Sequence, residues 1–382
     1  MWHAFCFSVR RVLGVMLAGG MVFVAPVALA QVVYGEVREL IRAEVIEVLE
    51  EYERDIMGTN TTTTVQVLRI MQIDGEFAGE AGRLENDLTI VAPGDTIFVH
   101  RIESIDGTQS FVFFDVDRRP QLVYLALFFV GLVVVFAGLQ GVRALISLGI
   151  SLAAIFYILV PMLLAGYSPA LTSLGISAII LSVTIFFTHG LNPRATISFL
   201  GTMGAVSVAC LIAYITVDTM RMTGFSSDAS VFLNFATGGS LDIAGLLLGS
   251  IIIGLLGVLD DVSITQASVV QELRAVNQQL SWRELYTRGI RVGRNHVGSL
   301  VNTLALAYVG AALPLVLLYT KANSELMITL NQEVVAAEIV RIIIGSIGLI
   351  LAVPFTTLMA AWYFKDKLVP ESAVVHHCGH HH

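Results

Sequence analysis

Seven apolar segments follow Pro120 in quick succession, and they constrain the fold of this chain more than any other feature. Each is long enough for an α-helix to cross a hydrocarbon layer of ~30 Å at 1.5 Å per residue. Hydrophobic residues make up 55% of the 382 residues and charged residues only 14%, a balance typical of multi-pass membrane proteins. The sequence therefore predicts a membrane all-α bundle over 120–365. The expected helices cover 121–139, 142–164, 170–188, 196–217, 241–261, 297–319 and 340–363.

The first 30 residues have the features of a targeting segment. Arg10 and Arg11 precede a short apolar run, and Ala28-Leu29-Ala30 precedes Gln31. A basic start, an apolar centre and an A-x-A site are typical of a secretory signal peptide. We predict that 1–30 is a cleaved signal peptide or a signal-anchor helix, and either one places the following residues outside the cytoplasm.

Residues 31–119 are polar and predict a small extracytoplasmic all-β domain. Five β-prone runs separated by turn residues favour an OB-like barrel. Between Glu36 and Asp117 lie 18 of the 30 acidic residues, so the domain is acidic, and we expect no nucleic-acid partner. The run RAEVIEVLEEYER also fits an acidic helix, because its apolar residues follow neither period. The β-prone runs are RAEVIEVLE, TTVQVLRIMQI, RLENDLTIVA, DTIFVHRI and QSFVFFDV.

Positive charge indicates the orientation of the helices. With the β-domain outside, the cytoplasmic loops carry Arg143, Arg194 and five arginines in 274–296, and Lys365 and Lys367 follow the last helix. Cytoplasmic loops of membrane proteins are enriched in Lys and Arg. The sequence therefore predicts a multi-pass plasma membrane protein whose C-terminus is cytoplasmic.

Two adjacent acids are the strongest candidates for a functional site. Asp260 and Asp261 lie 15 and 16 residues after Gly245, roughly 23 Å along a straight helix. Neighbouring carboxylates resist simultaneous ionisation, which suits a proton acceptor. Asp261, Thr265, Ser268 and Glu272 recur at helical spacing and predict a polar stripe. The alternative is structural: Asp261 caps a helix where the chain leaves the membrane.

Further candidates lie in the next apolar segment. We expect Asn295 and His296 to open that helix after the cytoplasmic loop, and Asn302 to lie beside the acids, where its amide can hydrogen-bond a carboxylate. His296 is either an interfacial histidine or a proton relay. The proposed proton or ion pathway is therefore Asp260, Asp261, Thr265, Glu272, His296 and Asn302.

Several stretches carry a family resemblance. They include GVLDDVSITQASVVQEL, FFTHGLNPRATISFLGTMGAV and RELYTRGIRVGRNHVGSLVNTLALAYVGAALPLVLL. The chain resembles the YibE/F family of bacterial membrane proteins over nearly all of 40–365. This resemblance implies an external β-domain joined to a multi-helix membrane domain in the bacterial inner membrane, with no established substrate.

A second resemblance concerns mechanism. The G-x-x-x-D-D helix end, the later acid and the R-E-L step are similar to the fourth and fifth helices of half an RND-superfamily permease and of the Sec subunit SecF. That resemblance implies that Asp260 and Asp261 carry proton flux. This chain lacks the second half, which supplies a lysine partner, and has two more helices before the acidic one. A homo-oligomer would be needed to rebuild two halves.

The C-terminal tail, 366–382, is His-rich. His376, His377, Cys378 and His380 are typical ligands of borderline-soft divalent metals. The tail is either an adventitious metal trap or a disordered terminus, and we expect no resident cofactor.

Two functions remain open from the sequence. The first is a transporter or permease coupled to proton or cation flux. The second is a non-transporting accessory or scaffold protein that presents its β-domain to an envelope partner. We expect no enzyme, because the chain has no G-x-S-x-G, P-loop, HExxH or GxGD motif. The bilayer is the expected environment in both cases.

Overall fold

The computed structural model describes residues 31–33, 36–58, 61–75, 77–103, 109–321 and 325–369. The chain divides into two compact units, Met1–Val135 and Phe136–His382, each described here by itself. The predicted signal peptide or anchor at 1–30 lies outside the described residues.

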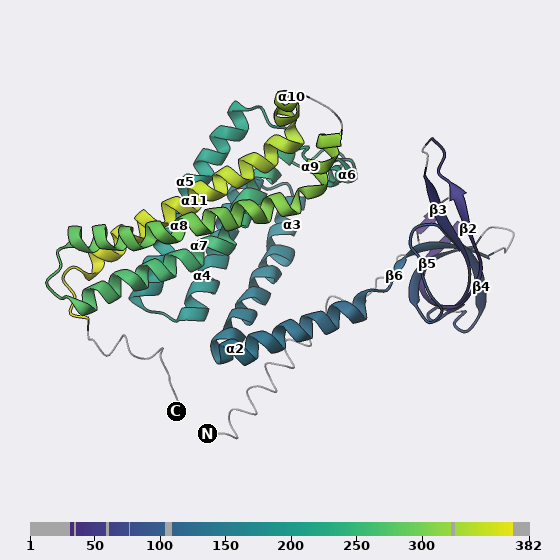
Figure 1. The fold of residues 1–382 in the computed structure, drawn as a ribbon, viewed down its shortest axis with the longest axis horizontal. Helices are drawn as coiled ribbons and strands as arrows, with labels where there is room; N and C mark the ends of the chain where they lie inside the picture. Colours follow the sequence, from purple (N-terminus) through teal and green to yellow (C-terminus); the bar gives the residue numbers. More distant parts are fainter. Residues whose placement is uncertain are drawn as a thin grey trace, which may run out of the picture. The chain divides into compact units, whose positions relative to one another are not determined.

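The first unit contains one antiparallel sheet that curls into a half-barrel (Figure 1). Its strand order is β4-β3-β2-β5-β6, and β1 pairs with β2 outside that path. The first half of β2 pairs with β5 and the second half with β3. The Phe111 side chain of β6 fills the space beside Gly82 of β4, so the two end strands approach each other. The strands are β1 (Gln31–Val33), β2 (Glu36–Asp55), β3 (Thr62–Gln72), β4 (Ala81–Asn86), β5 (Thr96–Glu103) and β6 (Gln109–Val116).

The structure confirms a β-rich unit, and the alternative of an acidic helix in RAEVIEVLEEYER is wrong. These residues belong to β2, whose register against β3 shifts between Val45 and Glu47 and between Val48 and Glu50. Each extra residue at such a bulge moves the following side chains to the other face. The apolar residues of β2 therefore follow no single period. The finer prediction of an OB-like barrel stays a prediction.

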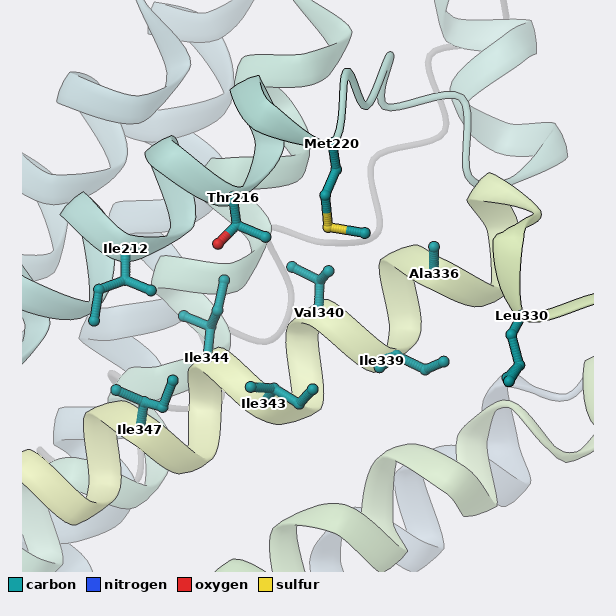
Figure 2. A pocket seen from close by; sticks show the side chains of 10 residues that line it. All are labelled: Ile212, Thr216, Met220, Leu330, Ala336, Ile339, Val340, Ile343, Ile344 and Ile347. Carbon is teal, nitrogen blue, oxygen red and sulfur yellow. The ribbon is translucent and has the colours of Figure 1, made fainter. Parts of the chain in front are cut away.

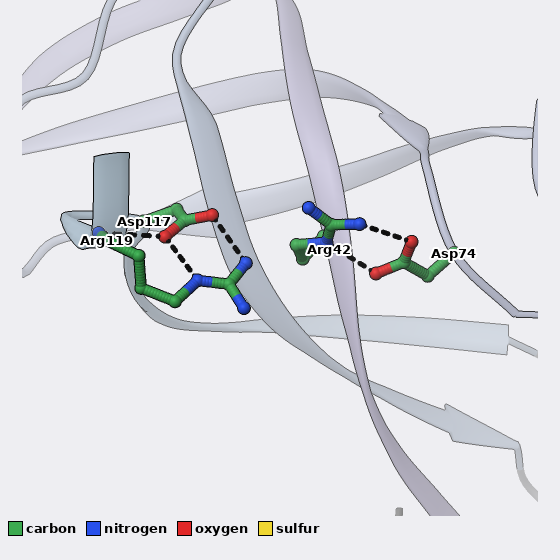
Figure 3. A network of polar contacts seen from close by, with 4 residues as sticks. All are labelled: Arg42, Asp74, Asp117 and Arg119. Atoms are coloured by element: carbon green, nitrogen blue, oxygen red, sulfur yellow. Dashed lines mark hydrogen bonds and ion pairs between the residues drawn. The ribbon is translucent and has the colours of Figure 1, made fainter. Parts of the chain in front are cut away.

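Two arginine–aspartate pairs lie beside strands of the first unit (Figure 3). Arg42 donates from Nε and Nη2 to the two carboxylate oxygens of Asp74, at 2.6 and 2.8 Å. Arg119 does the same to Asp117, at 2.7 and 2.6 Å. The Arg42 hydrogen bonds lower the pKa of the Asp74 carboxyl, and those from Arg119 lower the pKa of the Asp117 carboxyl.

The second unit is helical. Five described helical stretches are long and apolar enough to cross a membrane, or six if α8 and α9, which are bent by 61°, form one span. Its elements are α2 (Arg119–Ala154), the π-helix η2 (Ile155–Leu159), α3 (Val160–Leu164), α4 (Pro169–His189), α5 (Pro193–Thr219), α6 (Asp228–Ala236), α7 (Ile243–Val276), α8 (Trp282–Ala311), α9 (Leu313–Lys321), α10 (Leu326–Asn331) and α11 (Glu333–Phe364). The first of them, α2, begins in the first unit.

The expected count of seven spanning helices is not confirmed. The first two expected segments fall within one helical stretch, Arg119–Leu164. Gly138 interrupts this stretch with φ 55° and ψ −137°, a conformation that glycine tolerates and other residues rarely adopt. The helical backbone is therefore interrupted near the boundary that the sequence predicts, without an intervening loop.

The predicted cytoplasmic loop at 274–296 is mostly helical. The preceding helix continues to Val276, and α8 begins at Trp282. Ser281 and Glu284 form a capping box, in which the Ser281 amide donates to Glu284 Oε2 at 2.9 Å. The helix therefore starts at this cap, and Asn295 and His296 lie in its interior, so the prediction that they open the helix is wrong.

The central helix of the second unit is α7. In its most apolar stretch 56% of the residues are buried, against 39% or less in the other four stretches. It packs against α4, α5, α8 and α11 (Figure 1). Other helices therefore cover much of the surface of α7.

Candidate functional site

The acid pair lies inside an unbroken helix. The helix begins at Asp242, whose carboxylate accepts a hydrogen bond from the Gly245 amide at 2.8 Å, and it continues past Asp260 and Asp261 to Val276. The alternative that Asp261 caps a new helix is therefore wrong. Asp242 is the cap, and the acid pair needs another explanation.

The two acids face different surroundings. Asp260 is half-buried and Asp261 is exposed, because adjacent helical residues point about 100° apart. The Asp261 amide donates to Asp260 Oδ1 at 2.9 Å. In the described part of the chain neither carboxylate forms an ion pair with a basic side chain. Asp261 also interacts electrostatically with His189, the last residue of α4.

The predicted polar stripe lies on the outward face of α7. Asp261, Thr265 and Glu272 are exposed and Ser268 is half-buried. The opposite face carries buried residues such as Leu259. The stripe therefore points mostly away from the helical core, and of the two acids only Asp260 lies at the edge of that core.

The candidates on α8 are not brought together with the acids. His296 and Asn302 are both exposed. Among the hydrogen bonds of the described residues, none joins either side chain to Asp260 or Asp261. Their place in a pathway stays a prediction.

The sequence did not lead us to predict a buried polar layer that lies near Asp260. Gln266 is 4% exposed, and its amide Nε2 donates to the Gly289 carbonyl at 2.9 Å and to Thr357 Oγ1 at 2.7 Å. Ser263, one turn beyond Asp260, is fully buried. This amide joins α7, α8 and α11 at one level. Hydroxyl and amide residues inside apolar segments are the signal that could have pointed to it.

Three hydroxyls in this region have no hydrogen-bond partner among the described residues. They belong to Ser198 on α5, Ser263 on α7 and Thr356 on α11, and all three side chains are fully buried. Close helix packing buries them: a Cβ at Gly201 of α5 would lie 2.9 Å from the Thr356 Cα. Unpaired buried polar groups are rare in proteins. The helices α5, α7 and α11 therefore contribute three buried hydroxyls that are available to hydrogen-bond water or an ion.

The helical unit also contains a pocket whose lining is almost entirely apolar. It has a volume of about 250 Å³ and lies between α5 and α11, where Thr216 is its one polar lining residue (Figure 2). Ile343 and Ile344 are among its apolar walls. A single hydroxyl cannot replace the hydration of a cation, so this pocket does not suit an ion.

A buried arginine, Arg274, lies in the last turn of α7. Arg274 is 7% exposed and donates from Nη1 to the Leu280 carbonyl at 2.8 Å and from Nε to the Lys367 carbonyl at 3.2 Å. The α7–α8 turn and the end of the described chain are therefore fixed to one another. Arg274 is held by these carbonyls, and no acidic side chain in the described ranges pairs with it.

Nothing in the described part of the chain suggests a metal centre, since no three His, Cys, Asp or Glu residues there are grouped to hold an ion. The predicted ligands His376, His377, Cys378 and His380 lie outside the described residues.

Comparison with known proteins bears on the helical unit. Neither the curated proteins nor the solved structures show a match to this chain. The family model described as YibE/F-like protein matches residues 125–366. The matched region covers the helices and starts after the β-domain, so it is shorter than the resemblance over 40–365 noted from the sequence. It spans well over half of the chain, and the chain therefore belongs to the family of YibE/F-like proteins.

Proposed function

We propose that this protein is a membrane permease coupled to proton or cation flux, with Asp260 as the carboxylate that binds the ion. The observation that carries this proposal is the position of Asp260. It is half-buried in an unbroken helix that is long and apolar enough to span a membrane. No basic side chain of the described residues pairs with it.

The energetic argument starts from the cost of such a charge. An ionised acid at the centre of a membrane helix costs about 2.5–3.5 kcal/mol on the insertion scale. Some other carboxylates of the helical unit have two or more partners: Glu333 accepts from Thr223 Oγ1 at 2.8 Å and from the Gly224 amide at 2.6 Å. Among the hydrogen bonds of the described residues, the Asp260 carboxylate accepts only that of the neighbouring Asp261 amide. A proton or cation is the partner that would offset its cost.

The unpartnered hydroxyls support the same function. Ser263 follows Asp260 by one helical turn on α7, and Ser198 and Thr356 lie on α5 and α11, two of the helices packed against α7. Hydroxyl groups both donate and accept hydrogen bonds. They can therefore solvate a cation or hold water for proton transfer, because no other described residue uses their hydrogen-bonding groups.

The proposal also assigns a role to Asp261 and His189. Asp261 is exposed and interacts electrostatically with His189 at the end of α4. Histidine is a common proton relay near neutral pH. We infer that these two groups connect Asp260 with the aqueous side at this end of α7.

The proposal includes a placement in the cell. We infer that the helices cross the bacterial inner membrane with the β-domain outside and the arginines of 274–296 in the cytoplasm, in accord with the positive-inside rule. For the β-domain we propose an OB-like barrel, because β2 pairs with both β3 and β5 and because β4 approaches β6.

Proton flux into proteoliposomes tests the function. With an imposed pH gradient and an enclosed pH dye, we expect the native protein to carry protons. Asp260→Asn combined with Asp261→Asn should reduce flux to that of protein-free liposomes. Asp228→Asn, which changes an exposed acid at the start of α6, is the matched control and should retain native flux. Native protein that moves neither protons nor alkali cations under any gradient contradicts the proposal.

One observation favours the accessory function as a second candidate. The β-domain exposes apolar side chains at its loops: Met57 is 99% exposed, and Leu88 and Ile90 are each 71% exposed. Exposed apolar groups of this size are common at protein interaction sites. Crosslinking from Leu88 and Ile90 in intact cells would identify an envelope partner, and flux-free protein with such a partner would favour this function.

A further inference from the structure

A second group of polar side chains lies within the spanning helices, apart from the acid pair. Arg341 of α11 donates from Nη1 to Glu338 Oε1 and from Nη2 to Ser250 Oγ of α7, the latter at 3.5 Å. The Tyr308 hydroxyl of α8 lies against Gly254 of α7, one helical turn after Ser250. We call Ser250, Tyr308, Glu338 and Arg341 the Arg341 cluster. It joins α7, α8 and α11.

The Arg341 cluster lies well inside the helices. Arg341 follows Glu333, the first residue of α11, by eight positions, and Ser250 follows Ile243, the first residue of α7, by seven. At 1.5 Å per residue these positions are about 10–12 Å from the helix starts. The side chains of Arg341 and Glu338 are only 20% and 26% exposed. Charged residues at such positions in membrane helices mark ion and substrate pathways.

One face of α7 connects the cluster with the acid pair. Ser250, Gly254, Gly257 and Asp261 follow one another at spacings of four, three and four residues, so they lie along one side of the helix. The axial distance from Ser250 to Asp260 is about 15 Å. All four residues are exposed, and Asp260 lies at the edge of this face, about 100° around the helix from Asp261.

The two glycines leave room along that face. The Tyr308 hydroxyl lies 2.6 Å from where a Cβ of Gly254 would be, so it occupies the space that a side chain would need. At Gly257 nothing lies within 4 Å of that position. The phenol therefore reaches the α7 backbone between the two polar groups, and the next turn is open.

We propose that the Arg341 cluster is the second ion-binding station of the permease, connected to Asp260 along the glycine face of α7. In this proposal, which rests on the proposed function, Glu338 is the carboxylate that binds the ion. Arg341 is a positioning residue that holds Glu338. Tyr308 supplies the hydroxyl between Glu338 and Asp260, and water fills the space beside Gly257.

If the ion is a proton, every group that accepts a proton along this route also releases one. A proton from water binds to the Glu338 carboxylate, whose ion pair with Arg341 is thereby broken. Water at the cluster then takes this proton from Glu338 and protonates the Tyr308 oxygen, while the phenol releases its own proton to water beside Gly257. That water protonates the Asp260 carboxylate. Each group returns to its starting state when Asp260 releases its proton at the other end of α7.

Flux measurements separate this inference from the proposed function. We expect the double variant Glu338→Gln with Arg341→Gln, which leaves no unpaired charge, to lower proton flux about 100-fold. Tyr308→Phe should lower it about tenfold by removing one hydrogen-bonding group. Tyr214→Phe, at an exposed tyrosine of α5, and Glu325→Gln are the matched controls and should retain native flux. Flux within about twofold of native in the Glu338 and Tyr308 variants, with Asp260→Asn inactive, would overturn the inference and leave the permease intact.

Thiol labelling tests the connection without any transport. In protein with Cys6, Cys210 and Cys378 replaced, Ser250→Cys and Gly257→Cys should react in membranes with a charged, membrane-impermeant methanethiosulfonate reagent. Gly175→Cys is the control, because Gly175 of α4 is exposed and has open space at its Cβ position, as Gly257 does, but it lies about 200° around α4 from Ser173, which packs against Gly249, and so points away from α7. It should remain unlabelled. If Ser250→Cys and Gly257→Cys react no faster than this control, the glycine face holds no water and the inference fails, whether or not native protein carries ions.

Discussion

The two units of this protein differ in whether their most important buried or half-buried acid has a basic partner. In the β-domain even the nearly buried Asp117 is held by two hydrogen bonds from Arg119. In the helical unit Asp260 is half-buried and no basic side chain of the described residues pairs with it. The first arrangement stabilises a fold in water, where paired charges cost little. The second has a cost in an apolar environment that folding alone does not offset.

The units also differ in how their cores are built. The β-domain buries alternating side chains such as Ile41, Val45 and Ile97 between strands. The helical unit brings backbones close together at glycines, and it places hydroxyl and amide groups where they meet. This use of small residues is typical of helices that associate in lipid, where apolar burial drives association weakly. Substitutions of the two kinds should therefore have different effects.

The largest stability effect is expected at a glycine of the helical unit. A Cβ in Gly201→Ala would lie 2.9 Å from the Thr356 Cα, which can move only if α5 and α11 separate. Overpacking of this kind costs about 1–3 kcal/mol. The matched variant Gly175→Ala has open space and should gain up to about 1 kcal/mol from helix propensity. Thermal unfolding of the detergent-solubilised protein measures both, and equal midpoints would contradict close packing at Gly201.

A somewhat smaller loss is expected at Gln266. In Gln266→Leu, the Gly289 carbonyl and the Thr357 hydroxyl each lose a hydrogen bond in a buried site. A buried group left without its partner costs about 1–3 kcal/mol. Gln121→Leu, at an exposed position of α2, should leave the unfolding midpoint unchanged. A loss no greater than this control would mean that the polar layer does not hold the three helices together.

The paired acids of the β-domain predict a pH dependence. The pKa values of Asp74 and Asp117 are lowered by hydrogen bonds from Arg42 and Arg119, below the unfolded value of about 3.9. Their contribution to stability is therefore complete above about pH 4 and is lost as the pH falls through the lowered values. Calorimetry of the full chain should show a β-domain transition that is constant from about pH 7 to 5 and falls below about pH 4. A decline that starts near pH 6 would contradict the assignment.

The smallest effect is expected at a surface pair of the same domain. Arg69 Nη1 and Glu47 Oε1 are 3.2 Å apart, and both side chains are about half exposed. Exposed pairs contribute about 0–1 kcal/mol because water and salt screen them. Glu47→Gln should therefore shift the β-domain transition by less than Asp117→Asn does. A larger shift for Glu47→Gln than for Asp117→Asn would show that the burial of a charged pair does not determine its contribution to the stability of the β-domain.

Much of the fold follows from the sequence, and the exceptions have physical causes. The five β-prone runs all contribute to strands, but RLENDLTIVA leaves the sheet after Asn86. There the Asn86 side chain accepts from the Leu88 amide at 3.1 Å and donates to the Thr89 carbonyl at 2.5 Å, which forms a turn. The loop expected at 274–296 is mostly helix, because apolar length indicates where a membrane span lies and not where its helix begins. The S-x-x-E cap at Ser281 was the available signal.

The candidate site was predictable only in part. Two acids in an apolar helix are visible in the sequence, whereas which of them faces the core depends on the rotation of α7 against its neighbours. The role of Gln266 depends on contacts with Gly289 and Thr357, 23 and 91 residues away. One sequence contains no record of such distant contacts. For the same reason the expected neighbour of the acids, Asn302, is exposed.

The central claim is that Asp260 is retained for ion movement, whereas Asp117 is retained for stability. The most direct test measures the thermal unfolding midpoint and the proton flux of Asp260→Asn and Asp117→Asn in parallel. We predict that Asp260→Asn loses flux with an unchanged or higher midpoint, and that Asp117→Asn keeps its flux while its β-domain transition falls. An Asp260→Asn protein that unfolds at a lower temperature and still carries native flux would contradict the account.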